Sequence, residues 1–132
     1  MTRGYLNCNP LNIRLGKSKP WRGEIRPSRD VAFAQFKSMA FGYRAAFKLL
    51  RNYQELHGCR RLSDFISRWA PPSENDTQSY IATVAKRTRL SDVSQIDTHN
   101  EMQMRKIVSA MSFVENGIPA DEDEVRRGWE LL

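Results

Sequence analysis

Helix-breaking residues divide this chain into two unequal parts. Prolines and glycines interrupt the first 37 residues repeatedly, at Pro10, Gly16, Pro20, Gly23 and Pro27. Proline removes a backbone donor and glycine favours irregular backbone, so no long helix is expected there. The opening segment is therefore predicted to be irregular or strand-like. Small β elements are expected at Asn12–Leu15 and Ala32–Phe36.

The rest of the chain has the three- and four-residue apolar spacing of amphipathic helices. Capping and breaking residues place five helices: from Ser38 to Gly58, from about Ser63 to Pro71-Pro72, from Asp76 or Thr77 onward, from about Thr98 to Glu115, and from about Asp121 onward. The apolar faces of these helices supply the expected core, including Tyr43, Phe47, Leu50, Phe65, Ile66, Trp69, Tyr80, Ile81, Val84, Ile107, Met111, Val125 and Trp129.

The predicted fold class is mostly α, or α+β, with a small irregular or β-containing N-terminal lobe. The length of 132 residues suits one domain, 1–132. No apolar run approaches the ~20 residues of a membrane span. The first eight residues contain no apolar stretch typical of a signal peptide, so synthesis in the cytoplasm without a signal is expected.

The charge is unevenly distributed around a net value of +6. Residues 1–68 contain 14 Lys and Arg against 4 Asp and Glu, whereas residues 69–132 contain 7 against 11. The first half therefore favours a polyanion such as nucleic acid, an anionic wall polymer or a membrane surface. The acidic second half argues against a simple nucleic-acid coat protein.

Cysteine and histidine are too few for a disulfide framework or a structural zinc site. The chain has only Cys8, Cys59, His57 and His99, and their spacing matches no common metal motif. The cysteines are expected to be reduced, partly buried thiols. No metal and no organic cofactor is predicted.

The segment from Asn7 to Arg14 is rich in asparagine. Asparagine side chains bond to nearby backbone and stabilise irregular turns. Their amides also suit the hydroxyl and acetamido groups of a sugar. Asn9, Asn12 and Arg14 therefore either shape a loop or hold a saccharide.

The segment from Trp69 to Thr77 joins a helix ended by two prolines to the start of the next helix. Glu74 lies near the positive end of that second helix, which favours an ionised carboxylate. Glu74 is thus either a loop anchor or a second, charged carboxylate at a site. Asn75 beside it is a candidate substrate contact.

Glu115 has the opposite electrostatic setting, because it lies at a predicted helix C-terminus beside apolar residues. Both features disfavour ionisation. A protonated carboxyl is what cleavage of a glycosidic bond needs. The alternative is an exposed glutamate with no chemical role.

Aromatic residues supply candidate stacking surfaces for sugars or bases. Trp21 lies in the basic loop Lys19–Gly23 and is a better contact candidate than Tyr80, whose helical spacing also suits the core. The same basic loop suits phosphates. No phosphate-binding loop, dinucleotide motif or serine nucleophile motif is present.

Several segments resemble a protein family of bacteriophages and prophages whose members are often labelled virion structural proteins. The similar segments are Arg3–Arg14, Trp21–Gly23, Phe33–Ser38, Gly42–Ala45 and Arg68–Thr77 with Tyr80-Ile81. A more distant similarity links the Asn-x-Ile-Arg turn and the Phe-x-x-Phe strand to lysozyme-like glucosaminidases. In those proteins the acid ends a helix before small or polar residues, as in Glu115-Asn116-Gly117. The chain order differs, so this resemblance requires the C-terminal helix to pack beside the N-terminal turn.

The leading hypothesis is a lysozyme-like, peptidoglycan-directed phage protein, either a glycan-strand hydrolase or a lytic transglycosylase. Glu115 would be the general acid and Glu74 a second carboxylate or an anchor. Asn9, Asn12, Arg14, Trp21, Asn75 and Tyr80 would bind the sugar. Two alternatives are a non-catalytic virion or wall-binding component, with other virion proteins as partners, and, less favoured, a nucleic-acid-binding module.

Overall fold

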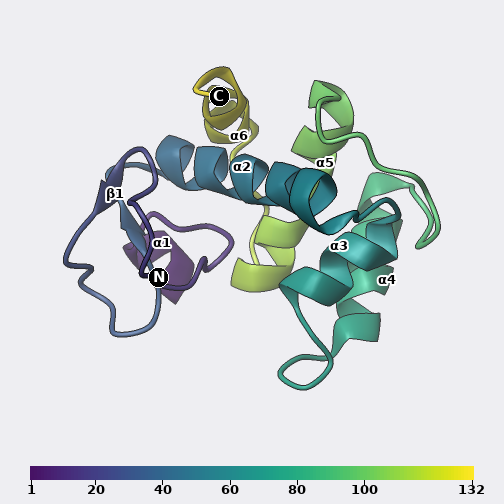
Figure 1. Ribbon diagram of the computed structural model, residues 1–132, viewed down its shortest axis with the longest axis horizontal. Coiled ribbons are helices and arrows are strands. Elements are labelled where there is room, and N and C mark those ends of the chain that lie inside the picture. Colours follow the sequence, from purple (N-terminus) through teal and green to yellow (C-terminus); the bar gives the residue numbers. More distant parts are fainter.

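The computed structural model describes all residues, 1–132, as two lobes joined by two long helices (Figure 1). The elements are α1 (Arg3–Leu6), β1 (Glu24–Ile25), β2 (Gln35–Phe36), α2 (Met39–His57), α3 (Leu62–Trp69), α4 (Thr77–Thr88), α5 (Glu101–Asn116) and α6 (Glu122–Glu130). α1 and the two strands form the N-terminal lobe. α3 and α4 form the opposite, helical lobe, and α2 and α5 run between the two.

α2 is the central element, and its ends lie where the sequence predicts. The Ser38 side chain accepts a hydrogen bond from the backbone N–H of Phe41, and Gly58 takes the left-handed conformation that ends the helix. One face is completely buried, including Tyr43, Phe47 and Leu50. These side chains belong to the main hydrophobic core, which also takes residues from α3, α4, α5 and α6.

α6 packs closely along α2 because a glycine lies at the contact. A side chain at Gly128 would approach the Cβ of Tyr43 to 2.6 Å and the carbonyl oxygen of Ala40 to 2.9 Å. Next to this contact, Trp129 packs edge-on against Phe47, with ring centroids 5.2 Å apart. The expected orientation of Val125, Gly128 and Trp129 towards the body of the protein is confirmed.

α3, α4 and α5 also follow their predicted patterns, with small shifts at their ends. Asp76 caps α4 by accepting a hydrogen bond from the Ser79 N–H. α5 begins at Glu101 rather than near Thr98, because Asn100 caps it. Thr98 instead bonds to Gln54 of α2 through its backbone and side chain. No helix is both long enough and apolar enough to cross a membrane.

The N-terminal lobe contains a short helix and a strand that the sequence did not predict. α1 spans four residues, too few for a visible apolar period, and Thr2 caps it. β1 pairs antiparallel with β2, joining Glu24 to Phe36 and Ile25 to Gln35. The element expected at Asn12–Leu15 is present only as a bridge between Arg14 and Phe33. A second, smaller hydrophobic cluster of Ile13, Ala34, Phe36 and Ala45 holds this lobe on α2.

Candidate functional site

The end of α5 is fixed to the opening turn of the chain by Asn116. Its buried amide donates to the carbonyl oxygens of Pro10, at 2.8 Å, and Ser112, at 2.9 Å. Its side-chain oxygen accepts a hydrogen bond of 2.7 Å from the Thr2 hydroxyl. Gly117 then leaves the helix in the left-handed conformation. These contacts place Glu115, the residue before Asn116, at the boundary between the two lobes.

Both carboxylate oxygens of Glu115 accept hydrogen bonds from neutral groups. The Nδ2 atom of Asn12 donates to Oε1 at 3.0 Å, and the Tyr80 hydroxyl donates to Oε2 at 2.9 Å. Burial, and secondarily the charge of Glu115, raise the pKa of Tyr80 well above its ordinary value. Tyr80 therefore remains a protonated donor, and no Lys, Arg or His lies within ion-pair distance of Glu115.

Asn12 reaches Glu115 because its backbone takes an unusual conformation. Its φ angle is +54°, in the left-handed region that asparagine tolerates better than most residues. The preceding turn is held by Asn9, whose amide donates to the carbonyl oxygens of Ile13 and Ala34 and accepts from the Ile13 N–H. The turn is thus built from asparagine side chains, as one of the two interpretations of this segment proposed.

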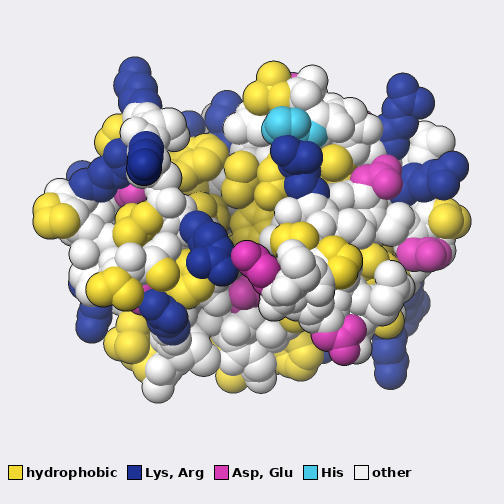
Figure 2. Space-filling model, turned by 60° about the horizontal axis from the view of Figure 1, so that its bottom comes forward, with side chains coloured by type: hydrophobic (Ala, Val, Ile, Leu, Met, Phe, Trp, Pro, Cys, Tyr) yellow, Lys and Arg dark blue, Asp and Glu magenta, His cyan; other side chains and the backbone are white.

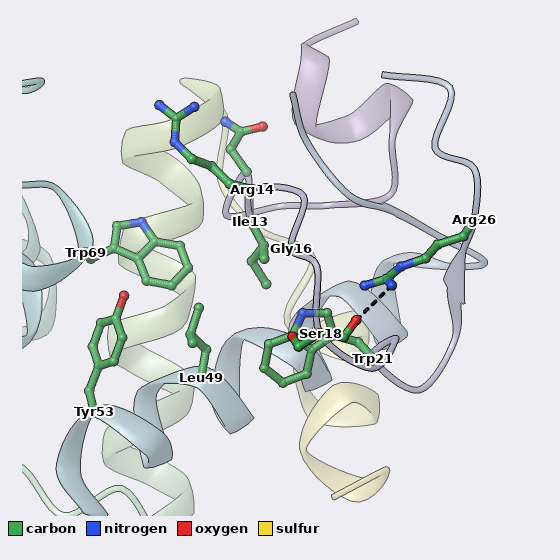
Figure 3. A pocket seen from close by; sticks show the side chains of 10 residues that line it. Ile13, Arg14, Gly16, Ser18, Trp21, Arg26, Leu49, Tyr53 and Trp69 are labelled. Carbon is green, nitrogen blue, oxygen red and sulfur yellow. Dashed lines mark hydrogen bonds between the residues drawn. The ribbon is translucent and has the colours of Figure 1, made fainter. Parts of the chain in front are cut away.

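A cleft of about 310 Å³ lies between the lobes beside this turn. Trp69 of α3 and Tyr53 of α2 line one side of the cleft, and Ile13 and Trp21 of the N-terminal lobe line the other (Figure 3). Leu49 of α2 lies between these two sides. Asn12, Arg14, Gly16, Ser18 and Arg26 complete the lining. A narrow space with aromatic walls and polar groups at its edge is a typical small-ligand or sugar site.

Glu115 lines a neighbouring hollow of about 330 Å³ together with Asn75, Asp76, Ser79, Tyr80, Thr83 and Val114. The hydrogen bond between Asn12 and Glu115 lies between this hollow and the aromatic cleft. The acid and the aromatic walls are therefore neighbours, although they come from opposite ends of the sequence.

Charged groups stand at the rim of the cleft. The Arg14 guanidinium lies 3.8 Å from the Glu74 carboxylate, and the two side chains are 67% and 59% exposed. This ion pair links the N-terminal lobe to the loop between α3 and α4. Figure 2 shows a hollow with a hydrophobic floor near the middle of this face, with basic and acidic side chains beside each other at its edge.

The structure brings together most of the residues singled out from the sequence. Asn12, Arg14 and Trp21 line the cleft, Asn75, Tyr80 and Glu115 line the adjoining hollow, and Glu74 lies at the rim.

The structure corrects one assignment from the sequence, that of Asn9, and adds a contact for Tyr80. Asn9 is completely buried, with its amide committed to backbone groups, so it cannot contact a sugar directly. The hydroxyl of Tyr80 donates to Glu115, and Tyr80 also lines the adjoining hollow.

Tyr53, Leu49 and Trp69 belong to the cleft but were not singled out as site residues. The helical periodicity places Tyr53 and Trp69 on core-facing positions, and both are only half-buried. For Trp69 the sequence signal was its position, because it ends α3 one residue before the double proline.

No family model matches the sequence. A search of known proteins instead finds Protein P5 of Pseudoalteromonas phage PM2, 37% identical over 131 residues that cover 97% of this chain and 80% of the relative. The chain belongs to the Protein P5 family. This similarity extends through both lobes, so the cleft lies wholly within the shared region. The expected relation to a phage protein is confirmed.

Proposed function

We propose that this member of the Protein P5 family is a lysozyme-like protein that cleaves the glycan strand of peptidoglycan, with Glu115 as general acid. The contact that carries this proposal is the hydrogen bond from Asn12 to Glu115. It joins the carboxyl at the end of α5 to the turn that lines the aromatic cleft. The acid therefore lies beside a space suited to sugar rings, with Trp21 and Trp69 on opposite walls.

The chemistry assigned to Glu115 is donation of a proton to the glycosidic oxygen as the bond to the sugar breaks. The carboxylate left behind then accepts a proton from the attacking water or sugar hydroxyl. Asn12 and Tyr80 hold the two carboxyl oxygens in a fixed orientation. Such positioning matters because misplacing an acid by 1 Å costs about 100-fold in rate.

The arrangement favours a mechanism with one acid. Glu115 lines the adjoining hollow, and the lining of the aromatic cleft contributes no second carboxylate. Asp76, the other acid near Glu115, is used to cap α4. We assign Glu74 an anchoring role through Arg14 rather than the role of a nucleophile.

The experiment that tests this proposal is digestion of purified peptidoglycan by the wild type, Glu115→Gln and Glu74→Gln. Wild type is expected to release soluble muropeptides, Glu115→Gln to release none, and Glu74→Gln to retain most of the activity. Circular dichroism establishes that both variants are folded. Failure of the wild type to release fragments, or full activity of Glu115→Gln, would contradict the proposal.

A second candidate is a non-catalytic virion component that binds the cell wall or other virion proteins. Its support is the relation to a phage protein, together with the fact that both oxygens of Glu115 already have partners within the protein. A structural glutamate would show the same contacts. This alternative predicts co-sedimentation with cell walls, or assembly into particles, without release of fragments.

A further inference from the structure

Two arginines, Arg14 and Arg26, are the charged residues that line the aromatic cleft. Arg26 is committed within the protein, because its guanidinium bonds to the Glu24 carboxylate at 3.0 Å and donates to the Ser18 carbonyl oxygen at 2.8 Å. The nearest carboxylate to the Arg14 guanidinium is that of Glu74, at 3.8 Å, which is beyond the distance of a hydrogen bond. Arg14 is therefore the cation of this lining whose N–H donors are free to bind a ligand.

The chain holds Arg14 in place without occupying its donors. Its backbone forms a β-bridge with Phe33, and its guanidinium lies over the Phe33 ring, 5.4 Å from the ring centroid. The side chain is nevertheless 67% exposed. In Figure 3 it extends at the end of the cleft away from Trp21. A planar guanidinium held in this way suits a carboxylate, which it binds through two parallel hydrogen bonds.

Glu74 indicates where such a carboxylate would lie. It comes from the loop between α3 and α4 and faces Arg14 from the other lobe, with 59% of its side chain exposed. An ion pair this exposed, without a hydrogen bond, contributes little free energy. A ligand carboxylate that makes two hydrogen bonds to Arg14 can therefore displace Glu74 at little cost.

We propose that Arg14 determines the specificity of the cleft by binding a carboxylate carried by the glycan. The preferred strand then contains N-acetylmuramic acid, whose lactyl group is acidic, rather than neutral N-acetylglucosamine alone. The aromatic walls and amides contact both sugars alike, whereas Arg14 distinguishes them by charge. Because Asn12, two residues earlier, bonds to Glu115, the acidic sugar would lie near the acid. This inference rests on the proposed function, since it takes the cleft as a glycan site.

The test compares the binding of two soluble tetrasaccharides by titration calorimetry. One alternates N-acetylglucosamine with N-acetylmuramic acid, and the other contains N-acetylglucosamine alone. Every protein carries Glu115→Gln, so that no ligand is cleaved. The protein with this change alone is expected to bind the acidic tetrasaccharide about fivefold more tightly than the neutral one. Added salt is expected to reduce this preference.

Substitutions at the ion pair show which residue provides the preference. Adding Arg14→Gln is expected to abolish the preference and to leave binding of the neutral tetrasaccharide unchanged. Arg14→Lys keeps the charge but loses the planar donor pair, so an intermediate preference is expected. Glu74→Gln is expected to strengthen binding of the acidic tetrasaccharide about twofold, because Arg14 loses its competing carboxylate. The matched control is Arg29→Gln, which removes an exposed charge of the same lobe outside the cleft and is expected to leave the preference unchanged.

The outcomes separate this inference from the proposed function. Equal affinity for the two tetrasaccharides overturns the role of Arg14 and leaves the cleft as a glycan site. A preference that survives in Arg14→Gln also overturns it, because another group would then bind the carboxylate. Binding of neither tetrasaccharide overturns both the inference and the proposed function.

Discussion

The side-chain amide of Asn12 donates to Glu115 across 103 positions of sequence, with 3.0 Å between Nδ2 and Oε1. This bond joins the polar turn near the start of the chain to the C-terminal end of α5. Asn116, the next residue, fastens the same helix end to Pro10 and Thr2. The acid, the polar turn and the aromatic cleft are consequently one connected unit.

Asn12→Gly tests whether that bond positions the acid. Glycine adopts the positive φ of position 12 without strain, so the variant removes the amide and leaves the backbone conformation available. We expect release of muropeptides to fall about tenfold or more, because Glu115 loses one of its two partners. Thermal unfolding should show a loss of only about 1 kcal/mol. Unchanged activity in Asn12→Gly would remove Asn12 from the account of the site.

Replacing the aromatic walls tests where the glycan binds. Trp69→Ala and Trp21→Ala each remove a wall of the cleft, and we expect each to weaken binding to peptidoglycan about tenfold. Leu56→Ala is the control, since Leu56 is exposed on α2 and does not line the cleft. Binding is measured by co-sedimentation with the Glu115→Gln background, so that cleavage does not deplete the wall. Equal binding by all three variants would place the ligand elsewhere.

The ion pair between Asp30 and Arg3 makes stability depend on pH. Hydrogen bonds from Arg3, then from backbone N–H groups and Asn7, hold the pKa of Asp30 well below its usual range. A depressed folded-state pKa contributes stability above the unfolded value of about 4, and this contribution is lost as the pH falls further. Asp30→Asn should therefore melt at a lower temperature than wild type at neutral pH.

The difference in melting temperature between these two proteins should narrow below about pH 4, as Asp30 in the unfolded chain takes up its proton. Thermal scans at a series of pH values check this directly. If the difference in melting temperature stays constant down to strongly acidic pH, Asp30 stabilises the fold through packing and hydrogen bonding that do not require its charge.

Gly128→Ala tests the contact between α6 and α2. The added methyl group would lie 2.6 Å from the Tyr43 Cβ, so the two helices must separate. We expect a loss of about 2 kcal/mol in the free energy of unfolding. Gly16→Ala is the control, because its nearest neighbour would be a serine hydroxyl at 3.7 Å. Equal stability of the two variants would show that α6 tolerates a shift along α2.

Local signals were sufficient to predict the five longer helices. Ser38, Asp76 and Asp121 cap their helices through their own side chains, and Gly58 and Gly117 end theirs, so each boundary depends on residues within one turn. α1 and β1 were missed because distant contacts hold them. Thr2 caps α1 while its hydroxyl bonds to Asn116, and β1 depends on pairing with β2.

The site was predictable only in part, because its assembly also depends on contacts between residues far apart in the sequence. Asn12, Trp21 and Glu115 were singled out by residue type, but their proximity depends on α5 reaching the N-terminal lobe. Asn9 was indistinguishable from Asn12 in the sequence, since both lie in the same polar turn. Burial separates them: Asn9 points into the lobe and bonds to backbone, whereas Asn12 points to the boundary and bonds to Glu115.

The most direct measurement is the number of new glycan-strand ends formed per molecule of wall-bound protein, compared between wild type and Glu115→Gln. Normalising to bound protein separates cleavage from attachment. We expect wild type to generate new ends steadily and Glu115→Gln to bind equally well while generating none. Equal and negligible production of ends by the two proteins, at equal occupancy of the wall, would show that the cleft binds without cutting and that Glu115 is not a general acid.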